Sequence, residues 1–262
     1  MKRSILALIM AISMTISAGC GKSEPPAETS QTSETTTAAE TTVTESTVKK
    51  LDYEIDPSKP VIALTFDDGP NTSTTKMVLD KLEKYGVRAS FFLVGNNIND
   101  ESAEIVKRAY DMGCEINNHS KTHGYMNSMT AEEIKSEVDY VSEKVSEITG
   151  EPTKFFRPPY IAVNETMYEN IDMPFIAGFG CNDWDAKVTA DERANKTLEQ
   201  AKDGAIILLH DAQGNLQTVT ALDKIIPPLL EEGYQFVTVS ELFEIKGKEI
   251  NGSDTNLYSI VE

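Results

Sequence analysis

The sequence predicts an α/β domain built on a mostly parallel β-sheet, and three observations support this class. Apolar segments with strand character alternate with amphipathic segments of helical period over residues 61–239. The strand-like segments are almost continuously apolar, as in Val61-Ile-Ala-Leu-Thr-Phe66, which is typical of parallel sheets buried on both faces. Polar motifs directly follow several of these segments. Together these features indicate parallel strands joined by helical crossovers.

Short segments rich in β-branched and aromatic side chains, bounded by polar or glycine residues, are the expected strands. In chain order they are residues 61–66, 89–94, 114–117, 155–156, 175–179, 205–209 and 236–239. The expected helices are residues 74–85, 101–112, 130–150 and 222–230. The first helix ends before Gly86 and the second at Gly113, because glycine is the usual stop. The third opens with a capping box, Thr130-Ala-Glu-Glu133.

The first 20 residues have the pattern of a targeting segment. Lys2 and Arg3 precede an apolar stretch, residues 5–16, that is too short to span a bilayer, and small residues then lead to Cys20. This pattern resembles a bacterial lipoprotein signal peptide with Cys20 as the lipidated residue, and ordinary secretion is the alternative. A lipidated Cys20 would hold the protein on the outer side of the cell membrane, with the lipid as its contact with the bilayer.

The remaining chain divides into three parts by composition. Residues 21–54 are rich in Thr, Ser and Glu and are expected to form a disordered stalk. Residues 55–246 form the expected single domain, since roughly 200 residues is the size of one domain. Residues 247–262 are expected to be a C-terminal tail, and the protein is expected to be a monomer.

Net charge and cysteine content limit the classes of partner and metal site that the protein is expected to have. The formal net charge of −18 argues against nucleic acid, which is bound through clustered Lys and Arg, and suits a neutral substrate with a divalent cation. The domain holds Cys114 and Cys181 without a Cys-x-x-Cys pair, so a thiolate metal site is not expected. The two are either buried free thiols or one disulfide.

Polar motifs follow five of the expected strands. They are Asp67-Asp68 after residues 61–66, His119 after 114–117, Arg157-Pro-Pro-Tyr160 after 155–156, Asp183-Trp184 after 175–179, and His210 after 205–209. Active sites of parallel α/β sheets are built at the carboxyl ends of strands, so these side chains are expected to meet in space. Taken singly, Asp-Asp-Gly is typical of a turn, His-x-x-x-His of a helix surface and a lone Trp of a core. Their co-occurrence favours one functional site.

The motifs also carry a family resemblance. Thr65-Phe-Asp-Asp-Gly69, His119-Ser-Lys-Thr-His123, Arg157-Pro-Pro-Tyr160, Asp183-Trp184 and Leu208-Leu-His210 are similar, in type and order, to the five motifs of the polysaccharide deacetylases. The polysaccharide deacetylases are carbohydrate esterase family 4, which is characterised by the NodB-homology domain. The resemblance covers about residues 59–243. It implies a distorted (β/α) barrel and a metal-dependent hydrolase acting on an acetylated polysaccharide.

Two imidazoles four residues apart and one carboxylate can form a three-ligand set that leaves positions open for water and substrate. The resemblance implies that Asp68, His119 and His123 are this set and hold one divalent metal ion. Zinc is the expected ion, with cobalt as an alternative.

The resemblance also implies the catalytic roles. Asp67 would be the general base, with Arg157 beside it, and His210 the general acid, with Asp183 beside it. A neighbouring cation should keep Asp67 ionised, and a neighbouring carboxylate should favour protonated His210.

Further roles concern the substrate. The backbone N–H of Tyr160 would bind the oxyanion of the intermediate, and Trp184 and Leu208 would line a pocket for the acetyl methyl group. Two positions depart from the family pattern: Cys114 stands where His is frequent, and Ile161 where Gly is frequent.

The stretches 181–185 and 204–211, followed by Pro227, Gly233 and residues 236–240, look similar to the acetylxylan esterase branch of the family. Xylan O-acetyl groups are therefore the expected substrate. N-acetylglucosamine units of peptidoglycan or chitin-like chains are the alternative. A non-catalytic glycan-binding lipoprotein is a third hypothesis, of another class.

Overall fold

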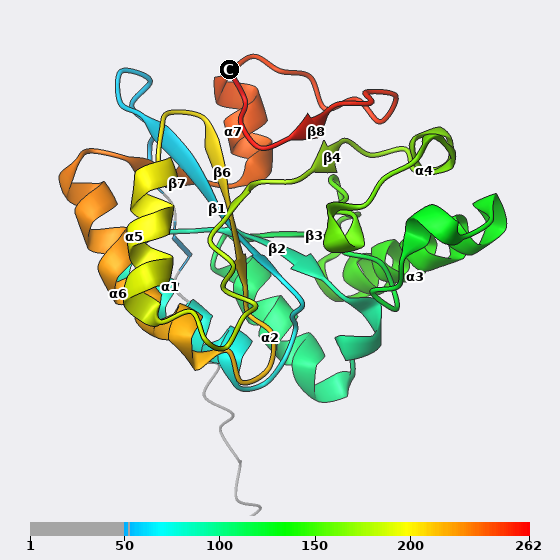
Figure 1. Cartoon of the computed structure of the whole chain (residues 1–262), viewed down its shortest axis with the longest axis horizontal. Coiled ribbons are helices and arrows are strands. Elements are labelled where there is room, and N and C mark those ends of the chain that lie inside the picture. The colour runs from blue at the N-terminus through cyan, green and yellow to red at the C-terminus, as the bar shows by residue number, and fades with distance from the viewer. Residues whose placement is uncertain (1–49, 52) are drawn as a thin grey trace, which may run out of the picture. The chain divides into compact units, whose positions relative to one another are not determined.

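Strand β1 lies at the centre of a parallel sheet (Figure 1). The strands that pair with β1 come from distant parts of the chain. The structure, a computed structural model, describes residues 50–51 and 53–262; Cys20 and the expected signal peptide lie outside the described residues. The sheet has the order β3-β2-β1-β6-β5, and β7 also pairs with β1. These strands are β1 (Val61–Asp67), β2 (Ser90–Leu93), β3 (Glu115–Asn118), β5 (Phe179–Gly180), β6 (Ala205–His210) and β7 (Gln235–Val237).

Further pairings carry this sheet round into a ring. Beyond β3, Asn118 pairs with Phe156, and Phe156 pairs with Phe175 of β4 (Phe175–Ile176). Strand β4 pairs with β8 (Leu257–Tyr258), and Ile260 then pairs with Ala205 of β6. The chain of pairings thus returns to β6, which confirms the expected distorted (β/α) barrel.

Two segments expected to lie outside the domain make contacts with it. Residues 247–262, expected to be a tail, include β8, where the N–H of Ala177 donates to the carbonyl of Tyr258 at 2.7 Å. Leu51, expected in the stalk, is buried, and its N–H donates to the carbonyl of Met112 at 2.8 Å. The apolar Leu51 and Val261 side chains supply the burial that holds these segments on the barrel.

Seven α-helices and three short 3₁₀ turns cover the described part of the barrel. They are α1 (Thr74–Tyr85), α2 (Asp100–Asp111), α3 (Ala131–Thr149), α4 (Glu165–Asn170), α5 (Ala190–Gln200), α6 (Leu216–Glu231), α7 (Val239–Ile245), η1 (Gly95–Asn97), η2 (Met126–Ser128) and η3 (Pro159–Ile161). Helices α5 and α1 both pack against α6 (Figure 1). The expected capping box of α3 is present, with the Glu133 N–H donating to Thr130 Oγ1 at 3.3 Å. The first three expected helices are confirmed within one or two residues.

The later elements differ from expectation. The expected strand 175–179 is split into β4 and β5, because Gly178 has a φ of +97° that breaks the extended run. The expected strand 236–239 ends at Val237, because Thr238 accepts from the Glu241 N–H and caps α7. Helix α6 begins at Leu216, six residues before the expected start, and α4, α5 and α7 were not expected.

Cys114 and Cys181 are both buried free thiols, so the disulfide alternative is wrong. Within the described ranges, no helix is long and apolar enough to cross a membrane.

Candidate active site

A cavity of about 470 Å³ opens at the carboxyl ends of the barrel strands. Asp67 ends β1, His210 ends β6, and His119 follows β3 directly. The parallel register of β1 and β6 pairs Asp67 with His210. The side chains that line the cavity are Asp67, Asp68, His119, His123, Pro158, Tyr160, Ile161, Trp184, Leu208 and His210. Residues scattered over 144 positions of sequence, from 67 to 210, therefore converge on one space.

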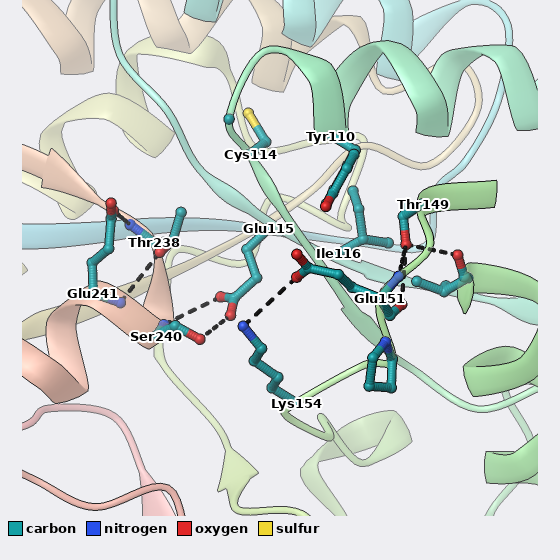
Figure 2. A pocket seen from close by; sticks show the side chains of 13 residues that line it. Tyr110, Cys114, Glu115, Ile116, Thr149, Glu151, Lys154, Thr238, Ser240 and Glu241 are labelled. Carbon is teal, nitrogen blue, oxygen red and sulfur yellow. Dashed lines mark hydrogen bonds and ion pairs between the residues drawn. The ribbon is translucent and has the colours of Figure 1, made fainter. Parts of the chain in front are cut away.

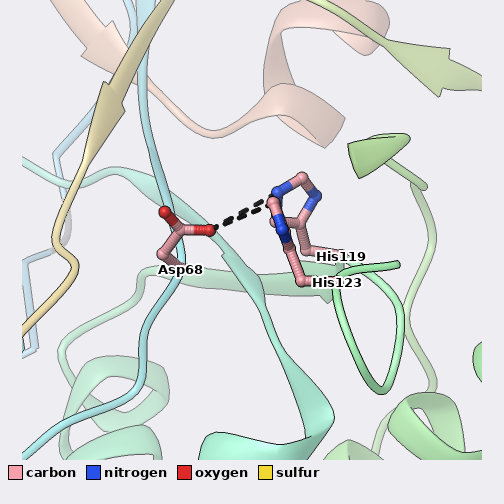
Figure 3. A group of neighbouring side chains, drawn as sticks. All are labelled: Asp68, His119 and His123. Carbon is pink, nitrogen blue, oxygen red and sulfur yellow. Dashed lines mark ion pairs between the residues drawn. The ribbon is translucent and has the colours of Figure 1, made fainter. Parts of the chain in front are cut away.

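Asp68, His119 and His123 form a group of potential metal ligands (Figure 3). Their ligand atoms all lie within 4.8 Å of one another. Asp68 Oδ1 is 3.4 Å from His123 Nε2 and 3.7 Å from His119 Nε2. Two ligands about 2 Å from a tetrahedral ion are separated by roughly 3.4 Å, so these spacings suit a small divalent ion. The one-carboxylate, two-imidazole composition of the set suits a borderline metal.

His119 is presented to this group as a neutral imidazole of fixed orientation. Its side chain is buried, and Nδ1 lies 2.7 Å from the carbonyl oxygen of Arg157. A carbonyl only accepts, so Nδ1 carries the proton and the Nε2 lone pair points toward Asp68. Burial lowers the pKa of His119 well below its ordinary value. A neutral imidazole with an available Nε2 is the form that binds a metal.

The two other candidate ligands depend on unusual backbone conformations. Asp68 has a φ of +75° and His123 a φ of +58°, both in the left-handed region. The His123 N–H donates to Ser120 Oγ at 3.0 Å, and Ser120 itself has a φ of +66°. Non-glycine residues held in this region are strained and cluster at functional sites.

Asp67 forms a buried pair with Arg157. Arg157 Nη1 donates to Asp67 Oδ1 at 2.6 Å, and both side chains are almost fully inaccessible. Burial raises the pKa of Asp67, while the Arg157 and His210 charges act in the opposite direction. The expected placement of Arg157 beside Asp67 is present, and burial makes this carboxylate more basic than an exposed one.

His210 is tied to Asp183 in the same manner, as a side chain paired with a buried group of opposite charge. His210 Nδ1 lies 2.7 Å from Asp183 Oδ1, and the His210 N–H donates to Asp183 Oδ2 at 2.7 Å. Burial alone would lower the pKa of His210, but the Asp183 hydrogen bond and charge, with the Asp67 and Asp68 charges, raise it to about 9. His210 is therefore held as an imidazolium at neutral pH.

The rim of the cavity is aromatic. Tyr160, with a φ of +60°, is exposed and stacks on exposed Tyr125 with ring centroids 4.1 Å apart. No described residue accepts a hydrogen bond from the Tyr160 N–H. Trp184, which by default would be a core residue, also lines the cavity and is 69% exposed. Leu208 of strand β6 lines the cavity as well.

Comparison with known proteins decides the family. The polysaccharide deacetylase family model matches residues 54–173, a range that contains all three candidate metal ligands. A family 4 acetyl xylan esterase from Clostridium thermocellum, solved with a cobalt ion, is 42% identical with a TM-score of 0.75, covering 77% of this chain and 98% of that chain. The chain belongs to the polysaccharide deacetylase family.

Other relatives of this chain carry different names. The Xyl-CE4 domain of a multidomain xylanase from the hindgut metagenome of Trinervitermes trinervoides is 52% identical, with a TM-score of 0.75 over 78% of this chain and 98% of that domain. A bifunctional xylanase/deacetylase of Pseudobutyrivibrio xylanivorans is 55% identical over 74% of this chain and 32% of its own length. A peptidoglycan-N-acetylmuramic acid deacetylase of Bacillus subtilis is 33% identical over 73% of this chain and 40% of its own length. The chain thus spans about a third of the length of the Pseudobutyrivibrio relative and two fifths of the length of the Bacillus relative.

Some residues that support the candidate site were not identified from the sequence. Thr218 Oγ1 donates to Asp183 Oδ2 at 2.7 Å, and Asn215 Nδ2 donates to the carbonyls of Asp183 and His210. Buried Arg193 donates to both Asn215 and Thr218. Each is a polar residue of α5 or the start of α6 without a distinctive motif, so only the fold reveals its contact with Asp183.

A second cavity, of about 240 Å³, lies by the first residues of β3 (Figure 2). Its carboxylates are already engaged. Glu115 accepts from Ser90 and from the N–H groups of Val239 and Ser240, and Glu241 pairs with Arg88. These contacts join β3 to α7 and occupy the carboxylates of Glu115 and Glu241.

Proposed function

We propose that this member of the polysaccharide deacetylase family is a metal-dependent hydrolase that removes acetyl groups from a polysaccharide, and that its substrate is O-acetylated xylan. One observation carries the proposal: the Asp68, His119 and His123 donor set shares a cavity with Asp67 and His210. Both of these side chains are held by a buried partner of opposite charge.

The proposed ligands Asp68, His119 and His123 hold one divalent ion, zinc or cobalt. Three protein ligands leave coordination positions open, which is typical of catalytic rather than structural sites. When bound, the ion acts as a Lewis acid on the acetyl carbonyl and lowers the pKa of a water molecule.

Asp67 is the proposed general base. Its Oδ1 accepts from Arg157, while Oδ2 lies 3.6 Å from His119 Nε2 and so faces the metal ligands. Oδ2 is thus placed to take a proton from the attacking water. The raised pKa of Asp67 favours this step, because a base works best when its pKa lies near the working pH.

His210 is the proposed general acid. Asp183 accepts from Nδ1, which leaves Nε2 as the proton donor to the leaving alcohol or amine. The pKa of about 9 keeps this proton in place at neutral pH. Asp183 thus orients the ring and stabilises its charge.

Substrate contacts follow from the rim. The N–H of Tyr160, which has no acceptor among the described residues, is a donor for the developing oxyanion. Trp184 and Leu208 form apolar walls for the acetyl methyl group. The exposed rings of Tyr125, Tyr160 and Trp184 offer flat apolar faces on which sugar rings can pack.

The xylan assignment is supported by the names of the three relatives described above with more than 40% identity: a xylanase/deacetylase, the Xyl-CE4 domain of a xylanase and an acetyl xylan esterase. Peptidoglycan deacetylation is the alternative, supported by the relative at 33% identity. Either polymer lies outside the cytoplasm, where the proposed lipidation of Cys20 would hold the enzyme.

Acetate release from acetylated xylan and from N-acetylglucosamine oligomers tests the proposal. We expect release that a strong chelator abolishes and that added zinc or cobalt restores, with the higher kcat/KM on xylan. Full activity of metal-free protein would contradict the metal role. Binding of both glycans without acetate release would favour a non-catalytic glycan-binding protein.

A further inference from the structure

The two proposed histidine ligands are held in different ways, although they belong to one loop, the histidine loop (residues 119–124). His119 is fixed by the sheet, because its N–H donates to the carbonyl of Leu93 and its ring binds the Arg157 carbonyl. Among the described residues, no group accepts a hydrogen bond from the Nδ1 of His123. The His123 ring contacts only the rings of His119 and Tyr160, with centroids 4.8 and 4.7 Å away, among the aromatic contacts of the described residues. Its position therefore depends largely on the backbone of the histidine loop, where its N–H donates to Ser120 Oγ.

That backbone is tied to two neighbouring elements. On one side, the N–H groups of Gly95 and Asn96 in η1 donate to the carbonyls of Ser120 and Lys121, at 3.0 and 2.8 Å. On the other side, Glu137 of α3 accepts from the Thr122 N–H at 2.8 Å and from Thr122 Oγ1 at 3.0 Å. The Glu137 bond is thus the attachment of the residue immediately before His123.

Glu137 is an unusual group to find in this place. Its side chain is 9% exposed, and no lysine or arginine of the described chain forms an ion pair with it. Burying a carboxylate without a cation is costly, and its hydrogen bonds here all go to one neutral residue. If the contact with Thr122 served folding alone, a neutral side chain could make it with a smaller free-energy cost of burial.

We propose that Glu137 is a positioning residue for the metal centre: it holds Thr122 so that His123 keeps its left-handed backbone conformation and presents its ring to Asp68. The inference rests on the metal site proposed above. A φ of +58° is unfavourable for His123 alone, so a loop freed from Glu137 relaxes away from it. Metal binding must then reorder the loop, which weakens affinity without removing any ligand.

Zinc affinity of the metal-free, full-length protein measures this directly, by competition with a chromophoric chelator. We expect Glu137→Ala to weaken the Kd by about 10- to 100-fold, the usual effect of removing a partner that orients a metal ligand. Thr122→Val, which keeps the N–H but loses the hydroxyl bond, should give a smaller loss in the same direction. Glu143→Gln removes a negative charge from an exposed position of the same helix and should leave the Kd unchanged.

A second background separates positioning from general damage. With His123→Ala already present, Glu137→Ala should weaken zinc binding no further, because the ligand that it positions is absent. An equal loss in both backgrounds, or an unchanged Kd for both Glu137→Ala and Thr122→Val, would overturn the inference. If Glu137→Ala does not fold, Thr122→Val with and without His123→Ala decides the same question. Failure of the unmodified protein to bind zinc would instead refute the metal site itself.

Discussion

Asp67 and His210 are register partners on the adjacent parallel strands β1 and β6. Neighbouring strands lie about 4.8 Å apart, so the backbone itself sets the separation of the proposed base and acid. A backbone hydrogen bond from the Asp211 N–H to the Asp67 carbonyl, at 2.9 Å, joins the two strands at this position. A substitution in either side chain therefore leaves the other in place, and the two roles can be tested separately.

The adjacent carboxylates Asp67 and Asp68 should respond differently to the same substitution. Asp68→Asn should lose metal affinity and activity together, because it removes a charged ligand. Asp67→Asn should retain the metal and lose about 10²- to 10⁴-fold in kcat, the usual contribution of a general base. Metal content and acetate release, measured on both variants, check this.

Asparagine has almost the same shape as aspartate, so each variant serves as the structural control of the other. Equal loss of metal from both variants would contradict the division of roles between Asp67 and Asp68.

The pH dependence of kcat/KM should be bell-shaped. On the acidic side, activity falls as the pH decreases, because Asp67 must be ionised and burial raises its pKa. On the alkaline side, activity falls as the pH rises through about 9, where His210 loses its proton. The groups interact, so the apparent values belong to the whole site.

Asp183→Asn tests the alkaline side. Burial lowers the pKa of His210 and the Asp183 hydrogen bond and charge raise it, so their loss should move the alkaline limb to lower pH. An alkaline limb at the same pH in this variant would show that His210 is not the group that titrates.

The first half of the fold was predictable because it opens with a long apolar strand and its helices are bounded by capping or stop residues. Strand β1 is seven buried residues in succession, and Thr130 and Glu133 mark the start of α3. Of the strands that close the barrel, β4 lies within the expected strand 175–179, whereas β8 was not expected. β4 and β8 are two residues each, and their pairing depends on partners more than 80 positions apart.

The candidate site divides in the same way. Residues that directly follow apolar strands could be placed together from the sequence, because parallel strands end at one edge. Glu137 and Thr218 could not, since a single carboxylate or hydroxyl on a helix carries no pattern and acquires its role through a contact with Thr122 or Asp183.

Anchoring should rest on Cys20. Two or three acyl chains hold a protein firmly on a bilayer, so Cys20→Ser should move the protein from the membrane fraction to the medium or leave it as an unprocessed precursor. Fractionation followed by mass spectrometry of the N-terminus checks this, with activity of the released domain as the control. A mature, membrane-bound Cys20→Ser protein would contradict lipidation at this residue.

Ile161 lines the cavity and has a φ of +55°. A β-branched residue is strained in this region, whereas glycine adopts it freely. Ile161→Gly should therefore raise the free energy of unfolding by about 1 kcal/mol, since relief of roughly 1–3 kcal/mol of strain outweighs the greater entropy of the unfolded chain. Chemical denaturation measures this.

The same substitution should change the choice of substrate. An ester needs less help from an acid than an amide does, so discrimination between xylan and N-acetylglucosamine polymers must come from the rim that seats the sugar. Removing the Ile161 side chain widens this rim, and we expect the ratio of kcat/KM for N-acetylglucosamine oligomers to that for acetylated xylan to rise about tenfold. Ile161→Ala, which trims the side chain but keeps the strained backbone, should shift the ratio in the same direction without the gain in stability. If the unmodified protein already prefers N-acetylglucosamine polymers, Ile161 does not exclude them, and the enzyme is a cell-wall-modifying deacetylase.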